Sequence, residues 1–521
     1  MTAAVPDQPQ GGHSLMPLPA NGVEWPPPAW ADQYATMRVD DAWYSGDPDR
    51  LAAVYARHAR RGDGRRRLWS RRPEAPLRPE TRMHIPLAAD IASTSAALLF
   101  SEPPTFTVDD RAAQQRLDHF AEAGGIANNL IEAAEVTAAL GGVFLRVTWD
   151  RELVDRPLLT VVHADCALPE FRYGILTAVT FWHELPSDSA TVWRHLERHE
   201  RGAILHGLYQ GSPDRLGTRV PLTEHPGVAD LAGSLGEQGD TIETGLPDAL
   251  TAAYVPNIGP NRRHRGSDLG RSDYAAPLYD LFDALDTTWS SWMRDIRLAR
   301  ARLIVPDGYV RDNGPGRGAS FDEDREIWTP LAIPPTEQGS GITLSQFAIR
   351  VDEHVRTAEA IVRQAVESAS YSAQTFGRGD APAVTATEVN ARERRSMMTR
   401  DVKGRYWAPA LADMLHVMLR LDRLLGYSTV SGEQRPNVQF GDSVSADPQS
   451  TAQTLALLAQ AEAASTDTKV RILHPDWDEQ QVRAEVDRIH EESGTAVPDP
   501  ITGAPAIPAE PDANPLESEN Q

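Results

Sequence analysis

Histidine and glutamate side chains lie close together in HLERHE, residues 195–200, and such groups can bind a metal ion. His195 and His199 are four residues apart with Glu197 between them, so the glutamate is not placed as in the HExxH motif of zinc enzymes. The alternating pattern of this segment predicts a strand, in which positions four apart are separated by about 13 Å at about 3.3 Å per residue. The sequence therefore predicts no metal site at these histidines.

Motifs for phosphate binding and for nucleophilic catalysis are also missing from the sequence. GSDLGRS, residues 266–272, lacks the lysine and the spacing of a P-loop, and the glycines of GRGDAP, residues 377–382, follow a predicted helix rather than a strand. No Gly-x-Ser-x-Gly elbow occurs. Without a nucleophile, a base and an orienting group that converge, the sequence predicts no catalytic residue, no cofactor and no enzymatic activity.

Arginines gather in NRRHRGSDLGRSD, residues 261–273, at Arg262, Arg263, Arg265 and Arg271. Two interpretations stay open for this segment: a loop whose arginines pair with acidic side chains, or a contact with DNA or a neighbouring subunit. A second arginine cluster at residues 57–72 leaves a similar choice between a solvated or acid-paired surface and a nucleic-acid contact.

The chain as a whole is acidic, with 74 Asp and Glu against 51 Lys and Arg and a net charge of −23 over 521 residues. This balance argues against a uniformly basic clamp on nucleic acid, although it is compatible with a passage through which DNA moves without sticking. A single cysteine excludes an intramolecular disulfide framework. No signal peptide and no apolar run of membrane-spanning length are found, so no membrane partner is expected.

Two long helices are the elements that the periodicity predicts most clearly. Apolar residues recur at steps of three and four over residues 276–300, with Pro277 in the first turn and arginines near the end. A second helix is predicted over 347–370, where Val and Ala form a narrow seam suited to packing against another helix. The segment between them is short and rich in Gly, Pro and acidic residues, with one strand expected at REIWTPLAI, residues 325–333.

The remaining segments predict an α+β fold that is predominantly α-helical. Helices are expected over 48–62, 85–100, 111–141, 385–425 with a kink at Pro409, 448–463 and 477–492, and a β-rich section over 158–255. The Pro- and Gly-rich N-terminal arm, 1–39, and the tail, 494–521, are predicted to be disordered.

Four stretches together resemble the portal proteins of tailed bacteriophages, most closely the siphophage type. They are LLFSEPP (98–104), AALGGVFLRVTWD (138–150), the first long helix with its flanks (270–306), and SASYSAQTFG (368–377) followed by TATEVNARERRS (385–396). The resemblance covers about residues 40–490.

The resemblance implies a head-to-tail connector ring of twelve subunits around an axial channel at one capsid vertex of the virion, assembled in the cytoplasm of a bacterial host. It implies a wing (40–275), a stem of two helices (276–300 and 347–370), a clip (301–346), a tunnel loop (371–384), a kinked wing helix (385–440) and a helical crown (441–493). The implied partners are double-stranded DNA, terminase, the head-tail adaptor, and the major capsid and scaffolding proteins.

The same resemblance assigns roles to particular residues. Those expected in the tunnel loop are Thr375, Phe376, Gly377, Arg378, Gly379 and Asp380. Those expected to pack in the stem are Leu285, Trp289, Trp292, Ile296, Val355 and Val362. Other classes stay open beside this one, namely another virion connector or minor capsid protein, or a soluble nucleic-acid-processing accessory enzyme.

Overall fold

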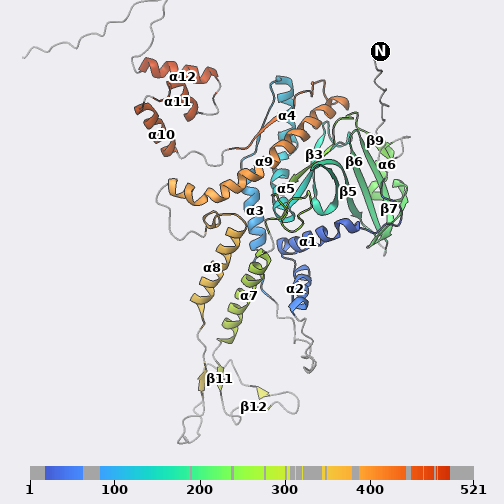
Figure 1. Cartoon of the computed structure of the whole chain (residues 1–521), viewed down its shortest axis with the longest axis vertical. Coiled ribbons are helices and arrows are strands. Elements are labelled where there is room, and N and C mark those ends of the chain that lie inside the picture. Colours follow the sequence, from blue (N-terminus) through green and yellow to red (C-terminus); the bar gives the residue numbers. More distant parts are fainter. Residues whose placement is uncertain are drawn as a thin grey trace, which may run out of the picture. The chain divides into compact units, whose positions relative to one another are not determined.

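The computed structural model describes residues 18–62, 82–187, 191–235, 240–274, 277–299, 302–304, 311–312, 319–320, 343–345, 349–377, 386–441, 448–461, 463–474, 477 and 479–492. Helices and antiparallel sheets alternate along the chain, which confirms the predicted α+β class (Figure 1). The chain divides into two compact units, residues 1–383 with 387–443, and residues 384–386 with 444–521. None of the helices in the described ranges is long and apolar enough to cross a membrane.

Five helices and one short strand begin the first unit. They are α1 (Pro28–Ser45), α2 (Pro48–Gly62), α3 (Leu87–Phe100), β1 (Thr105–Thr107), α4 (Arg111–Ala123) and α5 (Ile126–Leu140). The helical region predicted over 111–141 consists of two helices, α4 and α5, and α3 ends at Phe100 as predicted. Helices α3 and α5 pack against each other, and their small residues Ala92 and Ala138 are fully buried.

The prediction of a disordered arm over residues 1–39 is wrong for residues 18–39. Pro28 starts α1, where a proline costs no hydrogen bond, and Tyr34 and Trp43 of this helix are buried. Before the helix, Trp25 is 3% exposed and packs edge-on against Trp182 of the main sheet, with ring centroids 5.6 Å apart. Apolar burial therefore outweighs the Pro-rich composition that suggested disorder.

Two antiparallel sheets follow, as the alternating patterns predict. The first is β10–β2–β3, from β2 (Gly142–Thr148), β3 (Leu158–His163) and β10 (Ala252–Pro256). The second is β4–β5–β6–β7–β8 with β9 paired to β7, from β4 (Ala167–Arg172), β5 (Ile175–Leu185), β6 (Val192–Glu200), β7 (Ala203–Ser212), β8 (Arg215–Val220) and β9 (Thr241–Glu243). Helix α6 (Pro226–Leu235) packs beside β7 through Leu208 and Val228.

Helices α7 (Pro277–Leu298) and α8 (Val351–Ser368) run side by side and correspond to the two long helices predicted from periodicity (Figure 1). Between them the structure describes four short strands, β11 (Arg302–Ile304), β12 (Arg311–Asp312), β13 (Ala319–Ser320) and β14 (Thr343–Ser345). Strand β11 pairs with β14, and β12 pairs with β13, all antiparallel. The strand expected at REIWTPLAI, residues 325–333, lies outside the described residues.

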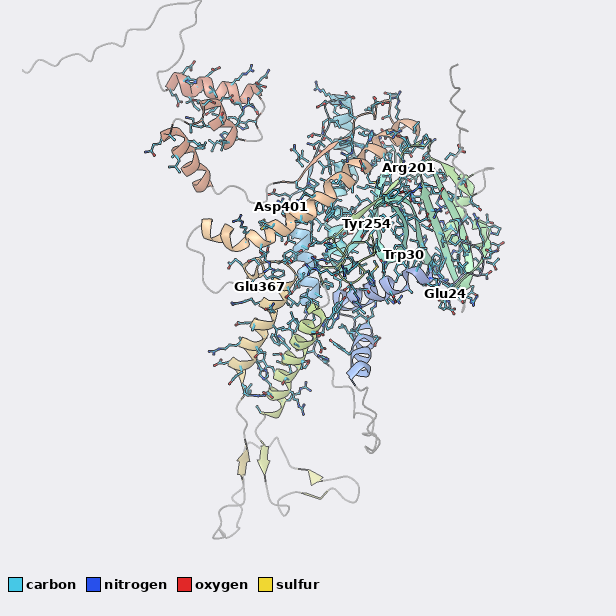
Figure 2. All side chains as sticks on the ribbon, in the orientation of Figure 1. Glu24, Trp30, Arg201, Tyr254, Glu367 and Asp401 are labelled. Atoms are coloured by element: carbon cyan, nitrogen blue, oxygen red, sulfur yellow. The ribbon has the colours of Figure 1, made fainter. Side chains whose placement is uncertain are left out.

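The 39-residue helix α9 (Ala386–Leu424) contains Pro409, and the kink predicted at this position stays a prediction. After α9, strand β15 (Asn437–Gln439) pairs with β1, which brings the segment after α9 beside the segment after α3. Trp407 and Leu411 of α9 are fully buried in a cluster with α4, α5 and β2. Figure 2 shows the side chains along these elements and labels Tyr254 on β10 and Asp401 on α9.

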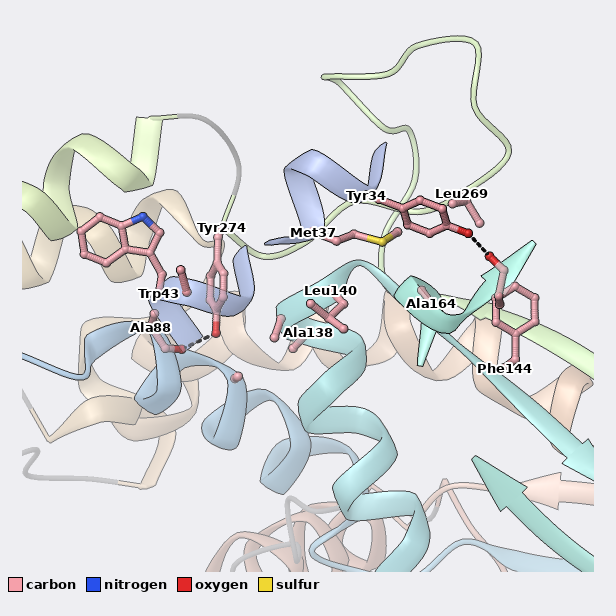
Figure 3. Packing of buried hydrophobic residues seen from close by; sticks show 14 of the residues in the cluster. Tyr34, Met37, Trp43, Ala88, Ala138, Leu140, Phe144, Ala164, Leu269 and Tyr274 are labelled. Atoms are coloured by element: carbon pink, nitrogen blue, oxygen red, sulfur yellow. Dashed lines mark hydrogen bonds between the residues drawn. The ribbon is translucent and has the colours of Figure 1, made fainter. Parts of the chain in front are cut away.

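One large apolar cluster joins the N-terminal helices, both sheets, α7 and α8. Figure 3 shows two tyrosines of this cluster whose hydroxyls end on backbone carbonyls. The hydroxyl of Tyr34 donates to the carbonyl of Ala167 over 2.6 Å, and the hydroxyl of Tyr274 donates to the carbonyl of Ala88 over 2.6 Å. These bonds tie α1 to β4 and the start of α7 to α3.

The second unit contains α10 (Pro448–Gln460), α11 (Thr466–Leu473) and α12 (Glu479–Glu492). Helices α10 and α12 were predicted, whereas α11 was not. The hydroxyl of Ser465 caps α11 by accepting from the amide of Thr468 over 3.2 Å, and Val470 and Val482 are buried.

Gly141 is the position where the turn from α5 into β2 meets the chain that leads to α7. Its φ is +88°, and an added Cβ would lie 2.8 Å from the amide nitrogen of Ser272 and 2.9 Å from the carbonyl carbon of Arg271. Gly125, at the other end of α5, also has a positive φ of +61°, but nothing lies within 4 Å of an added Cβ. An added side chain would therefore meet backbone strain at both glycines but steric crowding only at Gly141.

We predict that Gly141→Ala destabilises the protein by roughly 3 kcal/mol, because it adds backbone displacement to the left-handed strain. Gly125→Ala should cost only about 1–2 kcal/mol, from the strain alone. Thermal and denaturant unfolding of both variants measures the difference. Equal destabilisation of the two variants would contradict the close packing of residues 271–272 on the α5–β2 turn.

Candidate functional site

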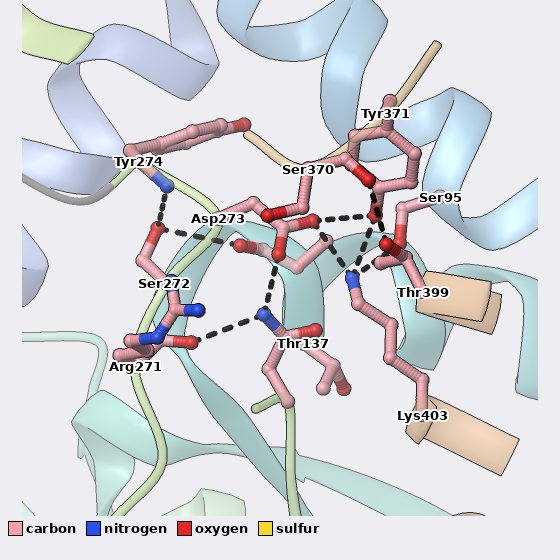
Figure 4. A network of polar contacts seen from close by, with 12 residues as sticks. Ser95, Thr137, Arg271, Ser272, Asp273, Tyr274, Ser370, Tyr371, Thr399 and Lys403 are labelled. Carbon is pink, nitrogen blue, oxygen red and sulfur yellow. Dashed lines mark hydrogen bonds and ion pairs between the residues drawn. The ribbon is translucent and has the colours of Figure 1, made fainter. Parts of the chain in front are cut away.

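A buried ion pair lies where α3 and α9 meet the inner ends of the two long helices α7 and α8. Asp273 lies four residues before α7, Tyr371 follows α8, Ser95 lies on α3 and Lys403 lies on α9. All four residues are at most 1% exposed. We call this group the junction network, and it brings together residues up to 308 positions apart in the sequence (Figure 4).

Lys403 makes every hydrogen bond that an ammonium group can donate. Its Nζ donates to Oδ2 of Asp273 over 2.7 Å, to Oγ of Ser95 over 2.6 Å and to the hydroxyl of Tyr371 over 2.9 Å. The Tyr371 hydroxyl in turn donates to Oδ2 of Asp273 over 2.9 Å. Asn257 donates from Nδ2 to Oδ1 of Asp273 over 2.8 Å, so both carboxylate oxygens are satisfied.

Burial makes this network costly to disturb. Removal from water lowers the pKa of Lys403, while the adjacent Asp273 carboxylate opposes that change. Burial and the same carboxylate raise the pKa of Tyr371 well above its usual value. A charge that has left water is tolerated only with its partner and its hydrogen bonds in place, so removing one member leaves the other uncompensated.

The segment after α8 is fixed on α9 close to the junction network. The hydroxyl of Thr399 donates to the carbonyl of Ser370 over 2.6 Å. The amide of Ser372 donates to Oγ of Ser396 over 2.8 Å, and Ser396 also bonds the hydroxyl of Thr375 over 2.8 Å. A short 3-10 turn, Ala373–Phe376, follows. The start of the predicted tunnel loop is therefore anchored.

A second aspartate fixes α7 to the N-terminal helices. Asp286 is 1% exposed, and its Oδ2 accepts from the hydroxyl of Tyr55 on α2 over 2.7 Å and contacts Nδ1 of His84 at 3.0 Å. Its Oδ1 accepts from the amide of Ile85 over 2.8 Å, just before α3. The spacing of apolar residues that predicts this helix gives no reason to expect this carboxylate to be buried.

A third aspartate joins α7 to α8. Oδ2 of Asp295 accepts from Nη2 of Arg350 over 2.9 Å and contacts Nε2 of His354 at 3.0 Å. Hydrogen bonds from these two residues lower the pKa of Asp295. The ring of His354 also stacks on Trp292, with centroids 6.0 Å apart and planes 7° apart. The contact between the helices is thus polar and aromatic at this end.

The residues expected to pack in a stem differ in their burial within one chain. Leu285 and Val362 are buried in the main apolar cluster. The side chains that are half-buried are Trp289, Trp292 and Val355. Ile296, near the end of α7, is 41% exposed. Of the residues expected in the stem, the single chain buries only the two that lie nearer the junction network, Leu285 and Val362.

The predicted tunnel-loop and arginine residues are placed in part. Thr375, Phe376 and Gly377 belong to the anchored turn, whereas Arg378, Gly379 and Asp380 lie outside the described residues. The exposed arginines of the segment before α7 are Arg262, Arg263 and Arg265, and Arg271 is half-buried. Within the parts of the chain that are described, these four arginines form no ion pair with a carboxylate.

His195 and His199 of β6 contact different partners. Nε2 of His195 lies 3.2 Å from Nδ1 of His206 on β7, and the two rings stack with centroids 5.3 Å apart. His199 instead bonds Thr251 and Glu197. In the described ranges, no group of three or more His, Cys, Asp or Glu side chains has an arrangement that could hold a metal ion.

A family model described as "Phage portal protein, SPP1 Gp6-like" matches residues 27–499 of the chain. The chain belongs to this portal family. The resemblance to portal proteins stated from four sequence stretches is thereby confirmed. Membership assigns this portal protein the structural role of a head-tail connector in a phage-like particle.

No curated protein matches the portal chain. Among solved structures it is similar to a chain in the "Neck of empty GTA particle computed with C6 symmetry", with a TM-score of 0.42 and 16% identity over 75% of this chain and 90% of that one. It is also similar to a chain in the "Neck of native GTA particle computed with C12 symmetry", with a TM-score of 0.38 and 14% identity over 81% and 99% of the two chains. The TM-scores are low, so family membership rests on the family model.

The junction network was missed from the sequence, although one clue was present. The portal chain contains only two lysines, Lys403 and Lys469, so a lysine is exceptional in a chain that otherwise uses arginine. A compact ammonium group can donate to three partners arranged around one point, which a planar guanidinium cannot do in the same space. The partners themselves come from distant segments and leave no local pattern.

We predict that Lys403→Met destabilises the portal chain by about 3–5 kcal/mol, because Asp273 keeps a buried charge without its partner. The double variant Asp273→Asn with Lys403→Met should recover a large part of this loss, because it removes both charges. Denaturant unfolding measures both effects. Lys469→Met, which changes the other lysine, serves as the matched control and should leave stability unchanged. A Lys403→Met variant as stable as the parent chain would refute the role given to this ion pair.

We also predict that the portal protein loses stability as the pH falls below about 6.5, the pKa of an unfolded histidine. Burial lowers the pKa of His195 to about 3 and that of His206 to about 4. Between the unfolded pKa and the lower folded pKa, the unfolded chain binds protons that the folded chain does not. Each histidine therefore lowers the free energy of unfolding by about 2 kcal/mol by pH 5. The measurement is the free energy of unfolding at pH 7 and pH 5. Replacing both residues with Gln should flatten this dependence, and an unchanged slope would argue against it.

Proposed function

We propose that copies of this portal protein close into a ring, of twelve subunits as the family resemblance implies, at one capsid vertex. Double-stranded DNA passes through its channel during packaging and ejection. Terminase docks on the ring during packaging, and the head-tail adaptor replaces it afterwards. The ring is assembled in the host cytoplasm together with the major capsid and scaffolding proteins. Each subunit meets the next through two different faces, as closed rings of this kind require.

The pair of helices α7 and α8 is the observation that carries this proposal. They enter and leave the folded body at one point, because Asp273 and Tyr371 meet on Lys403. In the proposed ring they form the stem, residues 301–346 form the clip, and the helices after residue 441 form the crown. The clip is then the docking segment for terminase and the adaptor.

The uneven burial of α7 and α8 supports contacts between stems. Ile296 is 41% exposed and Val351 is 43% exposed, at the end of the helix pair far from the junction network. Apolar side chains exposed in one subunit would be covered by the adjacent stem in a ring. Trp292 already stacks on His354 of the same subunit, so its outer face is what a neighbouring helix would meet.

The net charge of −23 supports passage of DNA rather than tight binding. An acidic surface repels phosphate groups and prevents the retention that a basic channel would cause. The tunnel loop, residues 371–384, would then be a local contact point, with Arg378 as its cation. Its start is anchored on Ser396 of α9, so the loop would be held at a fixed position in the channel.

We predict that replacing residues 378–383 with a Gly-Ser segment of equal length leaves ring assembly intact and reduces DNA packaging or retention. The anchors at Ser372 and Thr375 are kept, so the fold of the subunit should not change. Nuclease-resistant DNA per particle and electron micrographs of the purified ring measure the two effects. A Gly-Ser replacement of equal length at residues 505–510, in the C-terminal tail, serves as the control for a change of the same size. Loss of ring assembly in the loop variant would instead give residues 378–383 a structural role.

A further inference from the structure

A pocket of about 330 Å³ lies between α1, the segment before α7 and the first turn of α7. Its apolar lining includes Met37, Leu140 and Leu269, and the arginines that line it are Arg262, Arg263 and Arg271. This volume is in the range of sites for small molecules in proteins, which combine apolar walls with a few polar groups. The portal role described above makes no use of this pocket.

The arginine segment is held in place on α1, so the pocket exists without a ligand. Oδ1 of Asn261 accepts from the amides of Arg263 and His264 over 3.1 and 3.0 Å, and its Nδ2 donates to the carbonyl of Gly270 over 2.9 Å. Ser267 donates from Oγ to Gln33 over 3.1 Å. The bonds of Asn261 connect the two ends of the loop, and the bond of Ser267 attaches the loop to α1.

The positive charge at this pocket is only partly balanced by the described part of the chain, where Asp273 acts electrostatically on Arg271 and Asp40 on Arg263. No ion pair with a carboxylate is formed there by Arg262, Arg263 or Arg271. Nε of Arg271 is buried and has no hydrogen-bond partner among the described residues. Burial and the neighbouring Arg262 lower the pKa of Arg271, because both disfavour its charged form. An anion bound beside Arg271 would offset this unfavourable charge.

The one carboxyl group that lines the pocket does not oppose an anion at neutral pH. Asp40 is 2% exposed, and its Oδ1 accepts a hydrogen bond from the hydroxyl of Tyr279. Burial raises the pKa of Asp40 to about 8, so the group is mostly protonated at pH 7. A protonated carboxyl donates a hydrogen bond rather than repelling a negative ligand.

We propose that this pocket binds a small organic phosphate, with the phosphate on Arg271, Arg262 and Arg263 and the apolar part against Met37 and Leu140. Three guanidinium groups at one site suit a phosphate dianion, because each arginine can present two donors to its oxygens. The apolar walls require a ligand that is more than an inorganic ion. An acidic side chain of a neighbouring subunit would bring a single negative charge to three cations, so it fits the site less well.

The test uses phenyl phosphate as the probe and the full-length protein at pH 7 and low salt. Isothermal titration should give one site per subunit, with phenol and inorganic phosphate each binding at least about tenfold more weakly. Arg271→Gln should weaken binding of phenyl phosphate at least about tenfold. Arg265→Gln changes an exposed arginine of the same segment that does not line the pocket, so it is the matched control and should bind as the parent chain does.

Several results would overturn the proposal. They are the absence of binding, equal affinity for inorganic phosphate, and an Arg271→Gln variant that binds normally. If Arg271→Gln does not fold, as judged by its thermal unfolding, Arg262→Gln replaces it under the same criterion. Binding to unassembled subunits but not to assembled rings would show that a second copy covers the pocket, and this result also counts against a small ligand.

Discussion

The ion pair between Asp273 and Lys403 is the constraint on which the rest of the first unit depends. Both groups are withdrawn from water, and such charges are stable only while every donor and acceptor has a partner. The partners come from α3, from the approach to α7, from the end of α8 and from α9. Four elements therefore share one position, and none of them can shift without leaving a buried charge uncompensated.

The effect of this constraint extends along α7. Asp286 is a second buried carboxylate, which bonds α2 and the segment just before α3. Asp295 connects α7 to α8 farther along. The helix pair is thus fixed at its base, while its far end exposes apolar side chains such as Ile296. In the proposed ring, this division lets the base set the direction of the stem and leaves the far end for contacts between subunits.

Local periodicity predicted what depends on neighbouring residues. The helix expected over 276–300 is α7, Pro277–Leu298, because spacing and proline position act within a few turns. Helix α1 was missed because the Pro- and Gly-rich composition around it predicted disorder, whereas the burial of Trp25 and Trp43 is seen only in the folded chain. The junction network was missed for a similar reason, since Asp273 and Lys403 are 130 residues apart. The pairing of His195 with His206 likewise depends on strand register, which the sequence of one strand does not determine.

The claim that this portal chain works as a ring is tested most directly by class averages from electron micrographs of the purified full-length protein. We expect closed rings with a central hole, because the apolar far end of α7 and α8 needs a neighbouring stem to cover it. Compact single subunits at micromolar concentration, with no closed rings, would contradict it.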